Sequence, residues 1–261
     1  MRAAAIILSL SVAFCVIGCS KESRSSNEDN ALVLDVPFDA SSLSLQGIAG
    51  EYYFGDGLGV NCSLRLSVQG NFTFLWSGCL GTYDKNEGSA SVSNGILHIS
   101  PQKPNVREGL RGTPTEFYPV RWSRRMYLIP TNEIVEFCSD VNQGIEPRRG
   151  SHGEYYLRGK DAEKPVSGKP GVPEQWKKFF LSQPVRGRIT ELIGKQEAWL
   201  DKGAGDGLLA GMILTAQQHG KIMFSQVRVE AVEKGRCRVQ CRWKDSELAV
   251  GQTVSSRFFE P

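Results

Sequence analysis

Two neighbouring stretches of the chain alternate between apolar and polar residues, and this alternation constrains the fold more than any other feature. The apolar members all occupy even positions: Leu64, Leu66, Val68, Phe72, Phe74 and Trp76. A period of two is typical of half-buried β-strands and does not fit the 3.6-residue period of a helix. Because a short loop containing Gly70 separates the stretches, they are expected to pair as a hairpin with one apolar face.

The rest of the chain also favours strands over helices. Glycine accounts for 28 of the 261 residues, and long helical patterns are scarce. Asn94-Gly95 is a strong turn signal between two strands. Two short helices are expected at 134–141, capped by Asn132, and at 174–183. The further expected strands are 88–92, 95–100, 115–122, 125–130, 153–159, 186–193, 196–201, 211–217, 223–233, 236–243 and 250–258.

The length of 261 residues suits two domains of ordinary size. Residues 160–174 contain three prolines and two glycines, the composition of a linker. The helix that follows carries an apolar stripe expected to pack on the second domain, formed by Trp176, Phe179 and Phe180. We predict a mainly β protein with two small β-barrel or β-sandwich-like domains joined by a Pro/Gly linker and one short helix. The expected boundaries are a signal peptide at 1–18, a flexible tether at 19–46, a lipocalin-like β-domain at 47–160, a linker at 161–173 and a helix plus small β-barrel at 174–261.

The N-terminus begins with an apolar run that is too short to span a membrane. Residues 3–18, AAAIILSLSVAFCVIG, turn polar directly after Cys19 and fit the apolar core of a signal peptide. The segment Val16-Ile17-Gly18-Cys19 resembles the lipobox of bacterial lipoproteins. That resemblance implies that Cys19 is lipidated and becomes the first residue of the mature chain, where two or three acyl chains hold a protein stably on a membrane. The alternative is an ordinary secretory signal with an incidental cysteine.

The expected location follows from the lipobox resemblance. Ser20 lacks the negative charge that retains lipoproteins at the inner membrane in the best-known sorting system, which implies the outer membrane, facing the periplasm. The expected partners are the membrane, through the lipidated N-terminus, and an envelope protein or the cell wall. Residues 19–150 hold 12 Lys and Arg against 15 Asp and Glu, whereas residues 151–261 hold 18 against 13. This mild basicity in one half does not favour a nucleic-acid partner, since nucleic-acid binders are usually far more basic.

The most distinctive segment is GEYYFGDGLGVNCSLRLSVQGNFTFLWSGCLGTYDKNEG, residues 50–88. It resembles an uncharacterised β-domain of exported bacterial proteins, and this resemblance implies no activity. Residues 55–59 are expected to form a glycine-rich turn and not a phosphate loop, because a strand and not a helix follows. Residues 84–88 are expected to form a hairpin turn, since they lack the distal Glu of a calcium loop.

Four cysteines bear on the redox state of the folded units. Cys62 and Cys79 flank the first hairpin and could form a disulfide in an exported chain. Their positions are even and odd, so a regular hairpin would separate them, and a bulge at Gly78 would bring them to one face. Cys237 and Cys241 should be ~13 Å apart along one strand, beyond the ~7 Å limit for a bridge, and are expected to be buried free thiols.

The segment GRCRVQCRW, residues 235–243, places residues of opposite character on opposite faces of a strand. Cys237, Val239, Cys241 and Trp243 share one face, and Arg236, Arg238 and Arg242 share the other. The arginine row could bind an anionic partner, or it could be a solvated face that resists edge-to-edge pairing. This part of the chain resembles small SH3- or OB-like barrels of envelope and flagellar assembly proteins, which implies a binding or assembly module.

No catalytic or metal-binding signature is present in the sequence. The three histidines lie in different segments without metal-ligand spacing, and no GxSxG motif occurs. Cys138 is expected to be a buried, inert thiol. We therefore predict a membrane-anchored, non-enzymatic binding or assembly module with no cofactor. The alternatives are a lipocalin-like carrier of a small apolar ligand and a hydrolase using Asp56 and Asp84.

Overall fold

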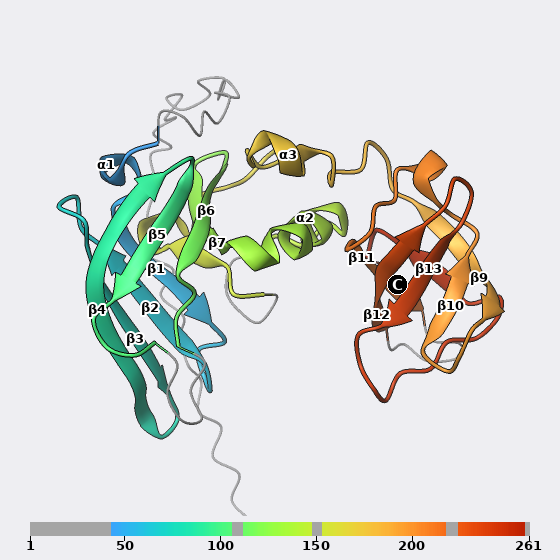
Figure 1. The fold of residues 1–261 in the computed structure, drawn as a ribbon, viewed down its shortest axis with the longest axis horizontal. Helices are drawn as coiled ribbons and strands as arrows, with labels where there is room; N and C mark the ends of the chain where they lie inside the picture. Colours follow the sequence, from blue (N-terminus) through green and yellow to red (C-terminus); the bar gives the residue numbers. More distant parts are fainter. Residues whose placement is uncertain (1–42, 106–111, 148–152, 218–223, 259–261) are drawn as a thin grey trace, which may run out of the picture. The chain divides into compact units, whose positions relative to one another are not determined.

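The computed structural model of the chain describes residues 43–105, 112–147, 153–217 and 224–258 (Figure 1). The predicted signal peptide, Cys19 and most of the predicted tether lie outside the described residues. No helix in these described ranges is both long enough and apolar enough to cross a bilayer.

The first folded unit is an eight-stranded antiparallel meander that closes into a barrel through pairing of its last strand with its first. The prediction of a mainly β protein with small barrels is therefore confirmed. The strands are β1 (Gly50–Gly55), β2 (Asn61–Leu66), β3 (Asn71–Gly78), β4 (Gly81–Ser93), β5 (Ile96–Pro101), β6 (Glu116–Trp122), β7 (Arg125–Pro130) and β8 (Tyr156–Arg158). Closure leaves no edge strand exposed in this barrel.

The interior of the first barrel is filled by side chains. Inward-facing residues alternate with outward-facing ones along each strand, as the pleat requires. The buried cluster inside includes Tyr52, Leu64, Leu66, Phe72, Phe74, Leu97, Ile99, Phe117, Met126, Leu128 and Tyr156. The short helix α1 (Leu45–Ile48) supplies Ile48, whose carbonyl accepts a hydrogen bond from the Tyr52 hydroxyl. The residues described inside this barrel therefore form one hydrophobic core.

The alternation in the first hairpin predicts the strand pairing correctly, but it wrongly predicts that Val68 is buried. Leu64 lies opposite Phe74 and Leu66 opposite Phe72, all four buried. Val68 instead lies in the turn after β2 and is 52% exposed, because the strand ends at Leu66. The turn at Asn94-Gly95 is confirmed, with positive φ at both residues, as a type I′ turn requires.

Two other local predictions for the first unit are wrong. Residues 84–88 form no turn and lie within β4, where Asp84 and Asn86 point inward and are buried. Asn132 does not cap the predicted helix, since it belongs to a 3₁₀ turn, η2 (Thr131–Glu133). The helix itself, α2, runs from Ile134 to Asn142, close to its predicted span.

The second barrel contains six strands in the order β10-β13-β12-β11-β14-β9 and is also closed. Its core includes Ile189, Ala198, Leu200, Leu214, Val227, Val229, Cys237, Val239, Cys241 and Val254. The strands are β9 (Arg186–Leu192), β10 (Glu197–Leu200), β11 (Ile213–Gln217), β12 (Phe224–Val232), β13 (Cys237–Cys241) and β14 (Thr253–Ser255). A 3₁₀ turn, η4 (Ala204–Asp206), precedes Gly207, whose φ of 88° is a backbone conformation that glycine adopts readily.

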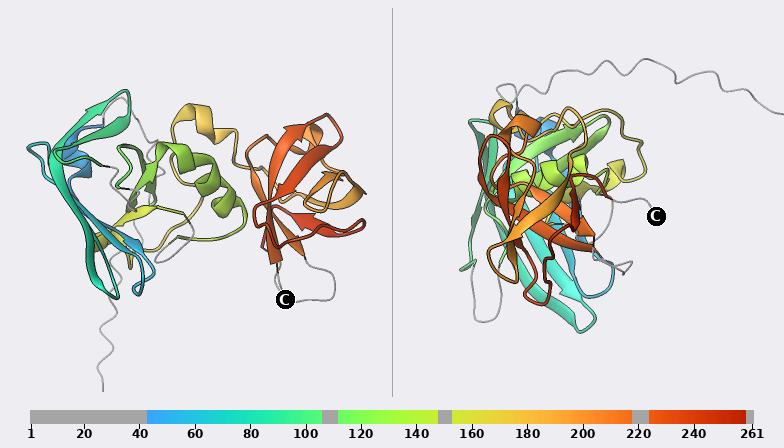
Figure 2. Two further views of the ribbon diagram at one scale, coloured as in Figure 1. Left: turned by 60° about the horizontal axis from the view of Figure 1, so that its bottom comes forward. Right: turned by 90° about the vertical axis from the view of Figure 1, so that its right-hand side faces the viewer.

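Helix α2 joins the two barrels through apolar and polar contacts. Phe137 packs edge-on against Trp122 and Tyr155 of the first barrel, and Figures 1 and 2 show α2 outside that barrel beside β6 and β7. On its other side, the Ser139 hydroxyl accepts a hydrogen bond from the Ile213 N–H at 3.0 Å. The Gln143 side chain donates to the Ile213 carbonyl at 3.2 Å. One hydrophobic cluster therefore runs from the outer face of β6–β8 through α2 into the second barrel.

The predicted linker begins at the 3₁₀ turn η3 (Gly159–Asp161), whose Asp161 is fully buried. Farther along, its Gly171 N–H donates to the Arg121 carbonyl of β6 at 2.7 Å. Helix α3 is confined to Glu174–Lys177, shorter than predicted. The Trp176 ring lies 6.0 Å from the Tyr118 ring of β6, so the apolar stripe contacts the first barrel as well as the shared cluster.

Candidate functional site

The residues of the distinctive segment 50–88 converge at one end of the first barrel. Alternate turns of a meander lie at the same end, so the β1–β2 turn (residues 56–60) and the β3–β4 turn (residues 79–80) are neighbours. Figure 1 shows α1 at one end of this barrel and the β3–β4 turn at the other. We call residues 56–60 and 78–81 the paired loops.

Asp56 fixes the conformation of the first loop. Its Oδ1 accepts hydrogen bonds from the backbone N–H groups of Val60, at 3.0 Å, and Leu58, at 2.8 Å. These hydrogen bonds to the charged form lower the pKa of Asp56 below its ordinary value. The predicted glycine-rich turn is thus confirmed, and Asp56 acts as its brace, as Asp side chains commonly do in turns.

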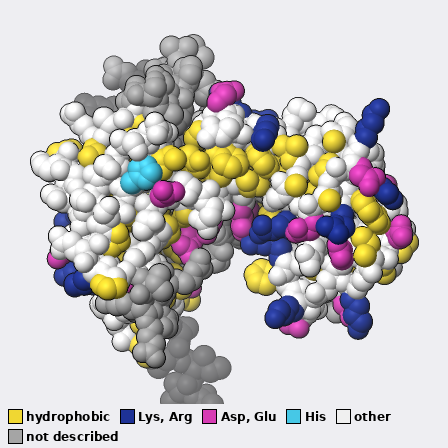
Figure 3. Space-filling model, viewed as in Figure 1, with side chains coloured by type: hydrophobic (Ala, Val, Ile, Leu, Met, Phe, Trp, Pro, Cys, Tyr) yellow, Lys and Arg dark blue, Asp and Glu magenta, His cyan; other side chains and the backbone are white. Residues whose placement is uncertain are grey.

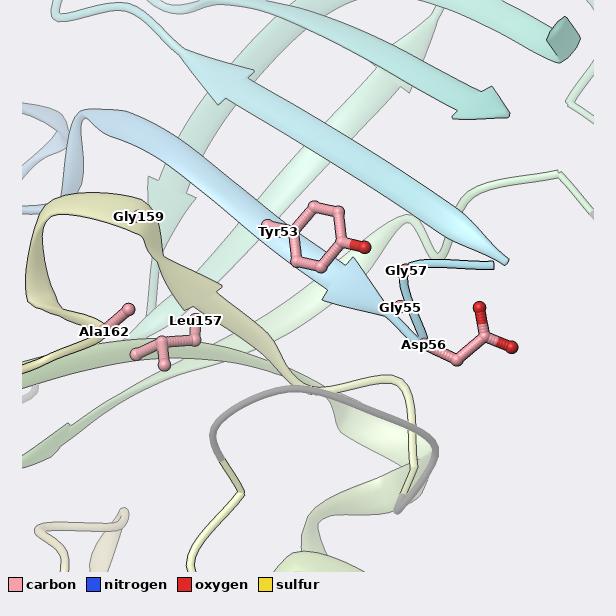
Figure 4. Close-up of a pocket in the computed structure, with 7 residues that line it drawn as sticks. All are labelled: Tyr53, Gly55, Asp56, Gly57, Leu157, Gly159 and Ala162. Carbon is pink, nitrogen blue, oxygen red and sulfur yellow. The ribbon is translucent and has the colours of Figure 1, made fainter. Parts of the chain in front are cut away.

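Asn61 and Tyr53 connect the loop to the barrel wall. The Asn61 amide donates to the carbonyls of Leu58 and Ser77, both at 3.4 Å, so it bridges the first loop and β3. The Tyr53 hydroxyl donates to the Asn61 side-chain oxygen. In Figure 4 the Tyr53 ring lies along β1 with its hydroxyl toward Gly55 and Gly57.

The two loops are packed directly against each other. The Cys79 thiol donates to the Leu58 carbonyl at 3.2 Å. A Cβ at Gly78 would approach the Gly59 carbonyl oxygen to 2.4 Å, so only glycine fits there. The Tyr83 ring packs against Trp76 at 5.4 Å, beneath the second loop. Backbone and side-chain contacts therefore hold the paired loops in one arrangement.

This rigid arrangement presents two leucines to solvent. Leu80 is 90% exposed and Leu58 is 73% exposed. Scattered exposed apolar residues are ordinary on a protein surface, but these two lie at the tips of loops that contact each other. The sequence alternation does not reveal them, because both lie in glycine-rich turns. The side chains of Leu58 and Leu80 therefore form an exposed apolar surface on loops whose conformation is already fixed.

Two hollows lie on the outside of the barrel, and the first of them reaches the paired loops at Asp56 and Gly57. The first, about 450 Å³, lies against β1 and β8 (Figure 4) and is lined by Tyr53, Gly55, Asp56, Gly57, Leu157, Gly159 and Ala162. The second, about 720 Å³, covers β1–β4, shares Tyr53 and Gly159 with the first, and includes Leu75 and Lys85. Aromatic, aliphatic and charged side chains together line the two hollows.

The predicted carboxylate pair does not form a common exposed site. Asp56 is exposed in the first loop, whereas Asp84 points into the barrel and is 3% exposed. Asp84 lies opposite Trp76 in the strand register and does not line the hollow that Asp56 borders. Within the described ranges, no group of three or more His, Cys, Asp or Glu could hold a metal ion.

The predicted Cys62–Cys79 bond is absent, and both residues are free thiols. Cys62 points into the barrel opposite Trp76, and burial raises its pKa to about 12. Cys79 lies exposed in the second loop. A register shift does occur, but between Trp76 and Ser77, where Tyr83 is the extra residue on β4. This bulge does not move Cys79 to the inner face.

The other thiols agree with their predicted states. Cys138, Cys237 and Cys241 are buried and free. Burial raises the pKa of Cys138 and of Cys237 to about 12, so both are poor nucleophiles at neutral pH. Trp243, which the alternation puts beside Cys241, is 59% exposed because β13 ends at Cys241.

Each arginine of the predicted anion-binding row has a carboxylate partner. Arg236 pairs with Glu233 at 2.7 Å and stacks 4.0 Å over the Trp199 ring. Arg238 pairs with Glu197 at 3.1 Å. Figure 3 shows Lys and Arg side chains of the second barrel beside Asp and Glu side chains on the visible face.

Arg242, the third of the row, has a structural role that the alternation does not suggest. Its guanidinium holds both oxygens of Glu136 on α2, at 2.8 and 3.0 Å. The row is therefore compensated, and its last member links α2 to the second barrel. Such a long-range pair leaves no local signal in the sequence.

Comparison of the chain with protein-family models, with curated proteins and with solved structures gives no match.

Proposed function

We propose that this chain is a lipid-anchored protein of the bacterial envelope in which the paired loops of the first barrel bind a partner protein. In this proposal Cys19 carries the anchor, the barrels are a scaffold, and the chain performs no reaction. The second barrel, with its compensated arginines, serves as a supporting module for α2. The outer membrane, facing the periplasm, is the proposed location.

One observation carries the binding proposal. The polar groups of the paired loops form hydrogen bonds with each other and with the barrel wall, whereas Leu58 and Leu80 are exposed to solvent. Burying a leucine side chain in an interface contributes roughly 1.5–3 kcal/mol. A preformed loop loses little conformational entropy on binding, which preserves more of that contribution.

The binding proposal is tested by placing a photo-crosslinking residue at position 58 or 80 in intact cells. We expect crosslinks to one discrete protein from both positions. The matched control positions are 68 and 250, where Val68 and Val250 are 52% and 64% exposed away from the paired loops. Identical crosslinks from the control positions, or none from 58 and 80, would contradict the proposal.

A co-purification experiment separates a binding defect from a folding defect. The double substitution Leu58→Ser and Leu80→Ser should abolish recovery of the crosslinked partner, because it removes the apolar side chains proposed to contact that partner. Since both side chains are exposed, the fold should be unaffected. The double substitution Val68→Ser and Val250→Ser should leave recovery unchanged. Equal thermal unfolding midpoints of both variants and the parent would show that the fold is intact.

The anchor is tested separately by Cys19→Ser. This substitution removes the sulfur to which the acyl chains would attach, so the chain should accumulate as an unlipidated form that is not acylated. Metabolic labelling with a fatty acid should mark the parent chain and not the variant. Label in the variant, or none in the parent, would exclude lipidation at Cys19.

A further inference from the structure

The end of the first barrel opposite the paired loops is unusually basic. It is formed by the β6–β7 turn and by the segment that follows β8. Residues 121–125 and 158–171 together contain seven Lys and Arg against two Asp and Glu. Four of these cations are exposed and form what we call the basic collar: Arg121, Arg124, Lys160 and Lys169.

Hydrogen bonds hold the two segments of the collar side by side. The Trp122 indole donates to the Gly168 carbonyl at 3.1 Å, and the Gly171 N–H donates to the Arg121 carbonyl at 2.7 Å. The Ser123 hydroxyl donates to the Ser167 carbonyl at 3.0 Å. Residues 167–171 therefore follow the β6–β7 turn closely, which brings the cations of both segments to one end of the barrel.

A buried carboxylate, Asp161, holds the segment that follows β8 in place. Asp161 accepts hydrogen bonds from Arg158 and Lys164, each at 2.6 Å, and from the Met126 N–H at 3.2 Å. Arg125 is fully buried, donates to the Lys164 carbonyl at 2.5 Å and pairs with Glu146. These internal pairs neutralise the buried charges. Of the four exposed cations, Lys169 also donates to the Leu181 carbonyl at 2.8 Å, and the exposed Glu163 is the one acidic side chain on the surface of these two segments.

The N-terminal segment enters the barrel beside this collar. β1 begins at Gly50, and a Cβ at that position would lie 3.1 Å from the Arg158 side chain. Figure 4 shows Gly159 next to the start of β1, away from Gly55 and Gly57. Between Cys19 and Leu43, the first described residue, lie 23 residues. A segment of that length spans at most about 80 Å when fully extended.

We propose that the basic collar lies against the anionic phospholipid headgroups of the membrane to which the chain is anchored. This inference rests on the proposed function for the anchor, and its occupant follows from charge complementarity and from the entry point of the tether. Each Lys or Arg near an anionic surface adds to the attraction, and the attraction weakens within a Debye length. In this orientation the paired loops point away from the membrane, toward a partner in the periplasm.

The experiment measures vesicle binding by the chain from Ser20 to Pro261, which contains every described element and no acyl chain. The probes are phosphatidylcholine vesicles with and without phosphatidylglycerol, collected by sedimentation at low and high salt. We expect binding only to vesicles containing phosphatidylglycerol, and loss of that binding at high salt. Absence of binding at low salt would overturn the proposal. The same outcome is expected if the acidic residues of 20–42 bind the collar in place of the membrane, because a collar that they cover would not bind vesicles.

Matched variants assign the binding to the collar. Arg124→Glu with Lys160→Glu should weaken vesicle binding at least about tenfold, since two attractive charges become repulsive. Lys234→Glu with Lys244→Glu changes the net charge equally on the second barrel, where both residues are exposed, and should leave binding within about twofold. An equal loss in both variants would overturn the assignment to the collar.

Two further measurements keep the result interpretable. The neutral pair Arg124→Gln with Lys160→Gln should give an intermediate loss, and circular dichroism should show an unchanged fold. Failure of the collar would leave fatty-acid labelling at Cys19 and crosslinking at the paired loops unaffected. Failure of the anchor would leave vesicle binding by the unlipidated chain unaffected.

Discussion

The Tyr155 hydroxyl donates a 3.0 Å hydrogen bond to Oδ2 of Asp140, and both side chains are buried where α2 meets the first barrel. Burial raises the pKa of Asp140 to about 7, aided by Glu136 and Glu133 and opposed by Tyr155 and Arg242. The carboxyl is thus half protonated near neutral pH. A titrating group sits on the helix that joins the two barrels.

Asp140→Asn should change how stability depends on pH. In the folded chain Asp140 keeps its proton up to about pH 7, and in the unfolded chain it releases the proton near the ordinary aspartate pKa of 3.8. Stability therefore falls as pH rises from about 4 to about 7. The variant lacks this fall, so at pH 8 it should exceed the parent by up to about 4 kcal/mol. Urea unfolding at several pH values measures the difference, which should vanish below pH 4. The exposed control Asp245→Asn should show no such trend.

Asp161→Asn should destabilise the chain at neutral pH. Burial acts to raise the pKa of Asp161, but hydrogen bonds from Lys164 and Arg158 outweigh it and lower the pKa below the ordinary value. The carboxylate therefore stabilises the fold above its unfolded pKa, and this stability is lost as pH falls through the folded pKa. We expect a loss of about 2–3 kcal/mol at pH 7, because two cations lose a buried partner. A parent and variant that unfold at equal urea concentrations at pH 7 would contradict this expectation.

Arg242 and Glu136 should be energetically coupled. Their bidentate pair is about three-quarters buried, with 23% and 22% of the side chains exposed, and it joins α2 to the second barrel. A double-mutant cycle with Arg242→Gln and Glu136→Gln should give a coupling of about 1–2 kcal/mol. The exposed pair Lys195–Glu247, at 3.4 Å, should give under about 0.5 kcal/mol in the same experiment.

Cys79 should be the fast-reacting thiol of the described residues. It is exposed, whereas burial raises the pKa of Cys62, Cys138 and Cys237 to about 12 and also raises the pKa of Cys241. Brief alkylation of the folded chain followed by peptide mass spectrometry should find label at Cys79, and denaturant should be needed for the other four. A chain in which Cys79 resists alkylation until a reductant is added would instead contain the disulfide with Cys62.

Gly78→Ala should disturb the paired loops, and Gly59→Ala should not. A Cβ at Gly78 would meet the Gly59 carbonyl oxygen at 2.4 Å and the Tyr83 ring at 2.5 Å, whereas a Cβ at Gly59 meets only Asp56, at 3.8 Å. We expect Gly78→Ala to cost about 2 kcal/mol of unfolding free energy and to weaken partner crosslinking from positions 58 and 80. If the two variants proved equally stable, the loops would not be packed as described.

Local patterns in the sequence determined the elements that depend on local physics. The alternation at 64–74, the Asn94-Gly95 turn and the helix near Ile134 lie where the pattern predicts them, because side-chain period and turn preference are set within a few residues. The errors lie where strands end, since Val68 and Trp243 continue an apolar alternation beyond the last paired residue. Residues 84–88 look like a turn but lie inside β4, because pairing with β3 and β5 overrides their weak strand preference.

The closure of both barrels, the convergence of the paired loops and the basic collar were decided by tertiary structure. Cys79 reaches Leu58 across 21 residues, Gly171 reaches Arg121 across 50, and Arg242 reaches Glu136 across 106. A sequence pattern reports the period of one segment and carries no information on which distant segment covers it. Only the packed chain brings exposed leucines to one end of the first barrel and exposed cations to the other, because burial of the apolar faces fixes the positions of the turns that carry them.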